Sequence, residues 1–124
     1  MIRNLEMLKA LSDMNRLRIV VALGRYEELC ACQITELLQV TGATVSRHLG
    51  VLQHAGVLKN RKEGRWIYYR LTPPSGADAL FQWLKKSAGE SDVFTTDRQT
   101  LEKIVGIGRE DLCRMQRGED CCPK

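Results

Sequence analysis

The sequence lacks the long apolar segments that mark membrane and secreted proteins. No run approaches the ~18 apolar residues that a membrane span requires. The first six residues also lack the apolar stretch of a signal peptide. Neither glycine-rich phosphate-binding pattern, G-x-x-x-x-G-K or G-x-G-x-x-G, occurs in the 124 residues. We therefore expect a cytoplasmic protein of about one domain, with no membrane partner and no organic cofactor.

Patterns for zinc sensing and for catalysis are missing as well. The two histidines, His48 and His54, are six apart and have no carboxylate at ligand spacing. Residues 75–89 hold a single acidic side chain, Asp78, which is too few for a carboxylate/histidine zinc site on a helix there. No C-x-x-C beside a β-α-β pattern and no acid–base constellation is present, so we do not expect an enzyme.

The positive charge is concentrated in one segment. The formal net charge of the whole chain is +4, whereas residues 41–72 alone carry six basic side chains and one acidic side chain. Such a concentration of cations is typical of a surface that contacts a phosphate backbone. Charge alone does not exclude an ordinary solvated surface.

Hydrophobic spacing predicts four short helices before residue 56. Leucines 5, 8 and 11 suit the first, and Ser12-Asp13 can cap a second that runs through residues 17–23. Ile34, Leu37 and Leu38 mark a third. Thr41 can cap a fourth, in which valine 45 and leucines 49 and 52 form the buried stripe and the outward positions are Ala43, Ser46, Arg47 and Gly50.

From Val57 onward the spacing of the apolar residues changes from the helical period to that of β-strands. Residues 57–61 and 65–71 are rich in β-branched and aromatic side chains and are separated by Lys62-Glu63-Gly64. They predict a hairpin with a basic tip. Trp66, Tyr68 and Tyr69 are assigned to packing within this hairpin rather than to base stacking.

Two further helices are expected after the hairpin. Following Pro73-Pro74, an apolar face of Ala77, Leu80, Phe81 and Leu84 is typical of a dimer interface. Leu101, Ile104 and Val105 lie on a possible last helix. We expect a DNA-binding and dimerisation domain over residues 1–89 and a C-terminal extension with a cysteine-containing tail over residues 90–124.

A short helix, a turn at residues 39–42, a second helix and a hairpin form a winged helix-turn-helix, a mostly α fold with a β-hairpin wing. Its second helix must present a slim polar side to a major groove about 12 Å wide. The residues expected to contact double-stranded operator DNA are Thr44, Ser46, Arg47 and His48 on this helix, and Lys62 and Arg65 near the hairpin tip.

Several motifs in order resemble one known family. Residues 41–49, 55–58 and 63–71 are similar to the winged-helix core of the ArsR/SmtB family of bacterial metal- and arsenic-responsive repressors. Residues 10–13 with 16–19 are similar to its second-helix signature, and residues 28–34 to its arsenic-type sensing motif. The resemblance covers roughly residues 5–85. It implies a homodimer that occupies an operator until an inducer binds.

Two positions depart from the family pattern. Gln39 stands where the family often has a glycine in the turn, and it is tolerated there if the backbone does not need a positive φ. Thr35 stands where the best-known arsenic sensors have the third cysteine of a C-x-C-x-x-C pattern. The inducer site is therefore incomplete within this motif.

Five cysteines occur in a chain expected to be in a reducing compartment, where buried, reactive or metal-binding thiols are more common than disulfides. On a regular helix Cys30 and Cys32 would point to nearly opposite sides, about 200° apart. If both sulfurs bound one soft ion, the helix that carries them would then have to unwind. The flanking charged and small residues do not predict an apolar pocket around the pair. Such a change could disfavour the DNA-bound form.

The family resemblance implies As(III) or Sb(III) as the inducer, which favours three sulfur donors. Cys121 and Cys122 are expected to complete the metal site with Cys30 and Cys32, whereas Cys113 is expected to be buried on the last helix. Alternatives are a persulfide or redox sensor and a cadmium or lead sensor of the same fold, although the N-terminus lacks the cysteines of the latter. A thiol-dependent reductase using Cys121 and Cys122 is a further alternative.

Overall fold

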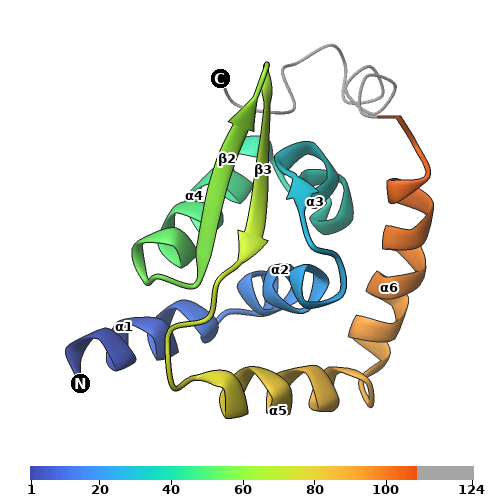
Figure 1. Cartoon of the computed structure of the whole chain (residues 1–124). Helices are drawn as coiled ribbons and strands as arrows, with labels where there is room; N and C mark the ends of the chain where they lie inside the picture. The colour runs from blue at the N-terminus through green and yellow to red at the C-terminus, as the bar shows by residue number, and fades with distance from the viewer. Residues whose placement is uncertain (109–124) are drawn as a thin grey trace.

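The computed structural model describes residues 1–108, and the elements follow one another as the sequence analysis predicts, with one additional strand. Their bounds are α1 (Ile2–Leu11), α2 (Met14–Arg25), β1 (Leu29–Cys30), α3 (Ala31–Leu38), α4 (Gly42–His54), β2 (Leu58–Glu63), β3 (Trp66–Leu71), α5 (Asp78–Ala88) and α6 (Asp92–Val105). Figure 1 shows the helices around one side of a narrow sheet.

Two helices begin at the caps that the sequence predicts. The Asp13 carboxylate accepts a hydrogen bond from the backbone N–H of Arg16 at 3.1 Å and starts α2. The Thr41 hydroxyl accepts one from the N–H of Thr44, also at 3.1 Å, and starts α4. The second of these caps fixes the orientation in which α4 leaves the turn.

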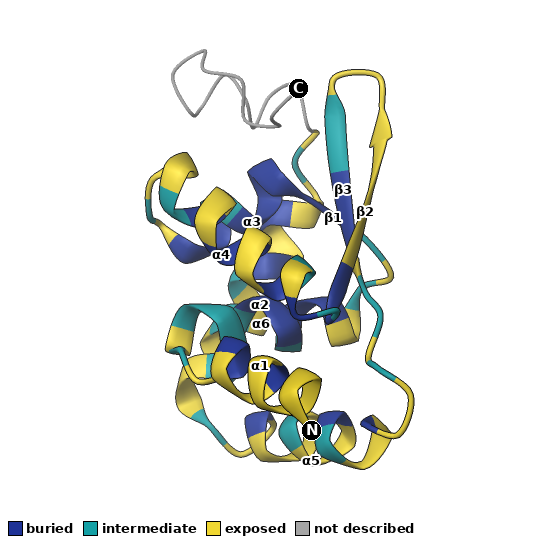
Figure 2. Ribbon diagram, turned by 90° about the vertical axis from the view of Figure 1, so that its left-hand side faces the viewer, coloured by how far each residue is buried: buried dark blue, intermediate teal, exposed yellow. Residues whose placement is uncertain are grey.

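A single apolar core lies between α2, α3, α4 and the sheet. Ile19, Ile34, Leu49 and Leu52 have at most 1% of their surface exposed, and the last two belong to the inward stripe predicted for α4. Figure 2 shows this buried layer beneath the exposed side of α4. Within residues 1–108, no helix combines the length and apolarity needed to cross a bilayer.

The sheet is antiparallel and has the strand order β1-β3-β2. Its long hairpin is the predicted one, but β2 extends to Glu63 and the connection is Gly64-Arg65. Gly64 has φ +62°, which fits the first central position of a two-residue type II′ turn. The helix-turn-helix followed by this hairpin confirms the winged-helix fold.

The turn before α4 does not meet the condition under which Gln39 was expected to be tolerated. Gln39 has φ +55° and ψ +41°, so the backbone does need the left-handed conformation that glycine adopts at little cost. The Gln39 side-chain amide donates to the backbone carbonyl of Glu36 at 2.7 Å and to its carboxylate at 3.0 Å. These two hydrogen bonds partly offset the backbone strain.

The last described helix joins the main core. Leu101 and Ile104 of α6 are 1% and 3% exposed, and α6 packs against α2 and α3, as Figure 1 shows. The Arg18 guanidinium of α2 holds both carboxylate oxygens of Asp97, at 2.8 and 2.9 Å, and also donates to the carbonyl of Leu37 at the end of α3. Residues 92–105 thus stabilise the domain they follow.

Candidate nucleic-acid interface and sulfur site

The outward side of α4 has the expected slim polar surface. Ala43, Ser46, Arg47 and Gly50 are all exposed. Thr44 is half-buried, and its hydroxyl lies 2.8 Å from the Thr41 hydroxyl at the helix cap. Within residues 1–108, Arg47 makes no ion pair, so its guanidinium is available to a base edge or a phosphate.

His48 does not belong to this outward surface, which corrects the expectation that it contacts DNA. It is only 5% exposed, and its Nδ1 lies 3.2 Å from the Arg16 guanidinium. Because a guanidinium can only donate, Nδ1 accepts this hydrogen bond and the imidazole is neutral. Burial lowers the pKa of His48, and the charges of Arg16 and Arg47 lower it further, against an opposing effect of Asp13.

The same Arg16 joins the recognition helix to the corner between α1 and α2. Its Nε donates to the carbonyl of Ala10 at 2.6 Å while its Nη1 donates to His48. The sequence held a signal for the burial of His48, which follows Val45 by three residues and precedes Leu52 by four, on the inward face. His48 therefore positions α4.

The wing presents two cations at its tip and neutralises a third nearer its base. Lys62 and Arg65 are exposed, and the Arg65 guanidinium lies over the Trp66 ring, 4.8 Å from its centroid. Within the described residues, neither cation makes an ion pair. The partly buried Trp66 and the buried Tyr68 and Tyr69 pack within the hairpin, as predicted.

Arg61 is the neutralised cation. Its guanidinium donates to both carboxylate oxygens of Glu28, at 2.6 and 2.7 Å, and to Glu63 at 3.0 Å. These hydrogen bonds raise the pKa of Arg61, and the bond from Arg61 lowers the pKa of Glu28. No spacing in the sequence identifies Glu28 as its partner, because the two are 33 residues apart. The net positive charge on the wing is smaller than the sequence count indicates.

Cys30 and Cys32 lie together, contrary to the prediction that their sulfurs diverge. The two Sγ atoms are 3.0 Å apart, beyond the ~2.05 Å of a covalent S–S bond. The physical reason is that Cys30 is the N-cap of α3, with extended φ −74° and ψ 150°, whereas only Cys32 is helical. The helical rotation of about 200° therefore does not apply to this pair.

The pair is also part of the core, although its neighbours in sequence did not predict an apolar pocket. Both side chains are 0% exposed, beside the buried Leu29 and Ile34. The Gln33 side chain accepts a hydrogen bond from the backbone N–H of Cys30 at 2.8 Å, one half of a capping box. Tertiary packing supplies the pocket, and the cap fixes the conformation that brings the sulfurs together.

A cross-strand row connects the sulfur pair to the wing. In the sheet, Cys30 is opposite Tyr68 of β3, and Tyr68 is opposite Arg61 of β2. The Arg61 guanidinium also lies over the Tyr68 ring, 4.7 Å from its centroid. The two-residue strand β1 was not predicted, since two residues show no periodicity. Through it, Cys30 is paired directly with β3, one of the two strands of the wing.

The remaining candidate ligands fall outside the described part of the chain. Cys113, Cys121 and Cys122 lie beyond residue 108. Within residues 1–108, no three side chains among His, Cys, Asp and Glu are grouped so that they could hold a metal ion. Among the described residues, the structure brings together the two predicted ligands Cys30 and Cys32.

The chain is similar to known bacterial regulators. Residues 13–60 match the family model described as bacterial regulatory protein, arsR family. The arsenic resistance transcriptional regulator ArsR1 of Pseudomonas putida is 41% identical over 76 residues, 60% of this chain and 59% of that protein. The arsenical resistance operon repressor of Escherichia coli is 41% identical over 101 residues, 82% of this chain and 80% of that protein.

Solved structures of the same fold include two further regulators. HlyU from Vibrio cholerae, in its reduced form, superposes with a TM-score of 0.61 at 26% identity, over 68% of this chain and 86% of that one. The antimony-specific transcriptional repressor AntR superposes with a TM-score of 0.55 at 25% identity, over 68% and 78% of the two chains.

Proposed function

Since the chain belongs to the arsR family of bacterial regulatory proteins, we propose that it is an arsenite- or antimonite-responsive repressor. It binds operator DNA as a homodimer and releases the DNA when cysteine sulfurs bind As(III) or Sb(III). The single observation that carries this proposal is the pair of sulfurs 3.0 Å apart at the start of α3.

The spacing of the pair suits two sulfurs that share one soft centre. A zinc–sulfur bond is about 2.3 Å long, so two sulfurs on one ion of that size lie less than about 4.6 Å apart. The Cys30 and Cys32 sulfurs already meet this limit without unwinding α3. Soft sulfur ligands select thiophilic centres over Mg²⁺ or Ca²⁺.

A third sulfur completes the coordination. Cys121 and Cys122 remain the proposed donors, and Cys113 is the other cysteine beyond the described residues. Drawing a further ligand to Cys30 and Cys32 requires room among side chains that are fully buried. The β1–β3 pairing and the first turn of α3 must therefore shift, and both lie next to the DNA-reading elements.

The DNA contacts follow from exposure and charge. We assign base-edge contacts to Arg47 and Ser46 and a backbone contact to Thr44 at the N-terminus of α4. Lys62 and Arg65 contact the phosphates beside the major groove. A shift of β1 changes the wing through Tyr68 and the Arg61–Glu28 ion pair, so the two wing cations leave their phosphates.

Exposed apolar side chains at the opposite end support the homodimer. Ile2, Leu5 and Leu8 on α1 are 75%, 50% and 51% exposed, and Trp83 on α5 is 62% exposed. Both helices lie at the end of the molecule away from the wing tip, as Figures 1 and 2 show. Large apolar side chains exposed on two helices at one end of the molecule favour an interface between two copies.

Release of labelled operator DNA, titrated with arsenite, cadmium and a persulfide donor in separate experiments, tests the inducer. Arsenite should release the DNA at the lowest concentration. Arsenic X-ray absorption should show three sulfur neighbours in the full chain and fewer after truncation before Cys121. Release by persulfide but not by arsenite would favour the redox alternative, and release by cadmium alone would favour the cadmium/lead sensor.

A further inference from the structure

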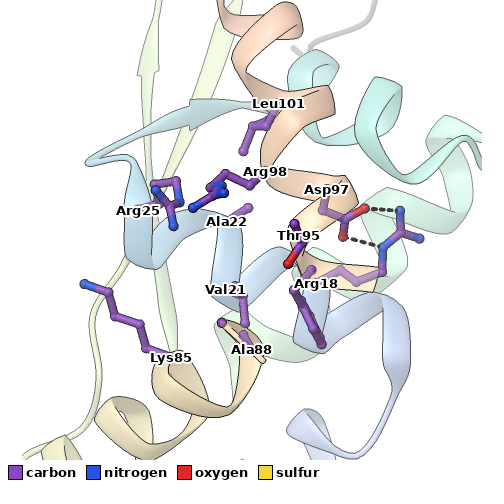
Figure 3. Close-up of a pocket in the computed structure, with 12 residues that line it drawn as sticks. Arg18, Val21, Ala22, Arg25, Lys85, Ala88, Thr95, Asp97, Arg98 and Leu101 are labelled. Atoms are coloured by element: carbon purple, nitrogen blue, oxygen red, sulfur yellow. Dashed lines mark hydrogen bonds and ion pairs between the residues drawn. The ribbon is translucent and has the colours of Figure 1, made fainter. Parts of the chain in front are cut away.

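A second candidate binding site lies between α2, α5 and α6. A partly open pocket of about 110 Å³ lies there, with Val21 and Ala22 of α2 and Leu101 of α6 among its apolar lining. Figure 3 shows these side chains together with several cations around the same space. No residue of this pocket belongs to the sulfur pair or to the predicted DNA contacts.

The pocket carries an excess of positive charge. Arg18 is paired with Asp97, which leaves Arg25, Lys85 and Arg98 in the lining. None of these three makes an ion pair within residues 1–108. In Figure 3, Arg25 of α2 and Arg98 of α6 project toward one another. Like charges repel unless an anion lies between them, so this arrangement favours a negatively charged occupant.

An apolar pocket adjoins the cationic one. Its volume is about 220 Å³, and it shares Val21 and Lys85 with the first pocket. Phe81 and Leu84 of α5 and Val20 of α2 dominate its lining, with Asp78 and Gln82 as polar members. This volume is many times the ~10–15 Å³ that one water molecule requires on the same measure, so the pocket has room for a short apolar chain.

We propose that the two pockets form one site for a medium-chain monocarboxylate. The carboxylate binds Arg25, Arg98 and Lys85, and the apolar chain extends past Val21 along Phe81 and Leu84. An inorganic oxyanion would leave the larger apolar pocket unfilled, and a neutral apolar molecule would leave the cations unpaired. Only an anion with an apolar body pairs with the cations of the first pocket and also fills the apolar second pocket.

Calorimetric titration of the full chain with octanoate tests the site. Acetate, which carries only the carboxylate, and 1-octanol, which carries only the apolar chain, are titrated for comparison. Octanoate should bind about tenfold or more tightly than either half, because it alone gains both the charge-assisted hydrogen bonds and the apolar burial. The titration contains neither DNA nor arsenite. Its result is therefore independent of the function proposed above.

Two substitutions locate the binding. Arg98→Gln should weaken octanoate by about tenfold and leave 1-octanol unchanged, since it removes one charged partner. Lys103→Gln is the matched control, because Lys103 is also an exposed cation of α6 but lies outside both linings. Gly24→Leu adds a side chain at the apolar pocket, where a Cβ meets no atom within 4 Å, so the helix should fold while octanoate binds more weakly.

Three outcomes would overturn the proposal. The first is an absence of saturable octanoate binding at millimolar concentration. The second is equal affinity for octanoate and 1-octanol, which removes the role of the cations. The third is octanoate binding that survives both Arg98→Gln and Gly24→Leu, which moves the ligand to another surface such as exposed α1.

Discussion

The sulfur pair and the DNA-reading surface are neighbours along the chain but differ in nearly every physical respect. Cys30 and Cys32 have no exposed surface and are held by a cap, a strand and the core. Arg47, Lys62 and Arg65 are exposed and make no ion pair within residues 1–108. In the proposed function, the first region changes the shape of the protein and the second passes that change to DNA.

This difference predicts which substitutions separate sensing from binding. A change in the buried pair should alter the response to inducer and the stability but leave the operator contacts in place. A change in the exposed surface should alter affinity for DNA and leave folding unchanged. His48, Arg16, Arg61 and Glu28 lie between the two regions and should affect both.

The largest expected effect comes from the sulfur pair. Cys30→Ser and Cys32→Ser should each raise the arsenite concentration for half-release of operator DNA by about 100-fold or more, since one of few strong ligands is lost. Operator affinity without arsenite, measured by fluorescence anisotropy, should change little. Thermal unfolding of each variant is the control for folding. Release at the wild-type arsenite concentration would exclude the pair as ligands.

Arg47→Ala should weaken binding to the specific operator by about 1–3 kcal/mol, the value of one good base contact. Its stability should remain within about 0.5 kcal/mol of wild type, because Arg47 is exposed. Competition between operator and unrelated DNA measures the loss of specificity. Lys103→Ala, at an exposed position of α6, is the control. Equal losses for Arg47→Ala and Lys103→Ala would disprove the groove assignment.

Lys62→Ala and Arg65→Ala should each lower the slope of log affinity against log salt by about 1, because each removes one phosphate contact. Arg61→Ala should lower it less, since Glu28 and Glu63 already neutralise that cation. Operator titrations over a range of salt concentrations measure the three slopes. A slope change for Arg61→Ala as large as the other two would place Arg61 on the DNA instead.

His48→Gln should destabilise the protein by about 1–3 kcal/mol near neutral pH by removing a buried partner of a charged group. The pKa of His48 is below its ordinary 6.5 in the folded protein, so the unfolded chain binds the proton more readily. The stabilisation is complete above pH 6.5 and is lost as the pH falls toward the folded-state pKa.

Urea unfolding of His48→Gln at several pH values below 6.5 checks this dependence. The variant should show less loss of stability on acidification than the wild type. His54→Gln, an exposed histidine on the same helix, is the matched control and should follow the wild type. An unchanged acid profile for His48→Gln would refute the buried neutral imidazole.

The smallest effect is expected at the turn before α4. Gln39→Gly should stabilise the protein by about 1 kcal/mol, because glycine adopts φ +55° without the steric cost. Gln53→Gly within α4 should destabilise by a similar amount, as glycine does in a regular helix. The denaturation midpoints of Gln39→Gly and Gln53→Gly measure the stabilisation expected for the first variant and the destabilisation expected for the second. Loss of stability in both variants would show that the Gln39–Glu36 hydrogen bonds outweigh the strain.

The sequence predicts most of the fold because its elements are local. The caps at Asp13 and Thr41 and the stripe of Val45, Leu49 and Leu52 depend on neighbours within four residues. The two-residue strand β1 depends on Tyr68 and Tyr69, almost forty residues away, and no periodicity indicates it. The charge pairing of Arg61 with Glu28 is equally non-local.

The relative placement of Cys30 and Cys32 was predicted wrongly, and their role as ligands stays a prediction. Treating residues 30 and 32 as helical placed their sulfurs on opposite sides, whereas the helix begins between them. A shift of one residue in a helix boundary is ordinary in sequence interpretation, and here it decides whether the two sulfurs start apart or together. For His48 the correct face could be read from its spacing to Val45 and Leu52.

If Cys30 and Cys32 bind the proposed inducer, their complete burial also limits how fast it can act. A dissolved ion cannot reach atoms with no exposed surface, so binding waits for a local opening of β1 and the first turn of α3. At high inducer concentration the rate of DNA release should then level off at the opening rate instead of rising in proportion. In this proposal, the opening rate of the protein limits the speed of DNA release, whereas the affinity of the ion for the sulfurs sets the inducer concentration that is needed.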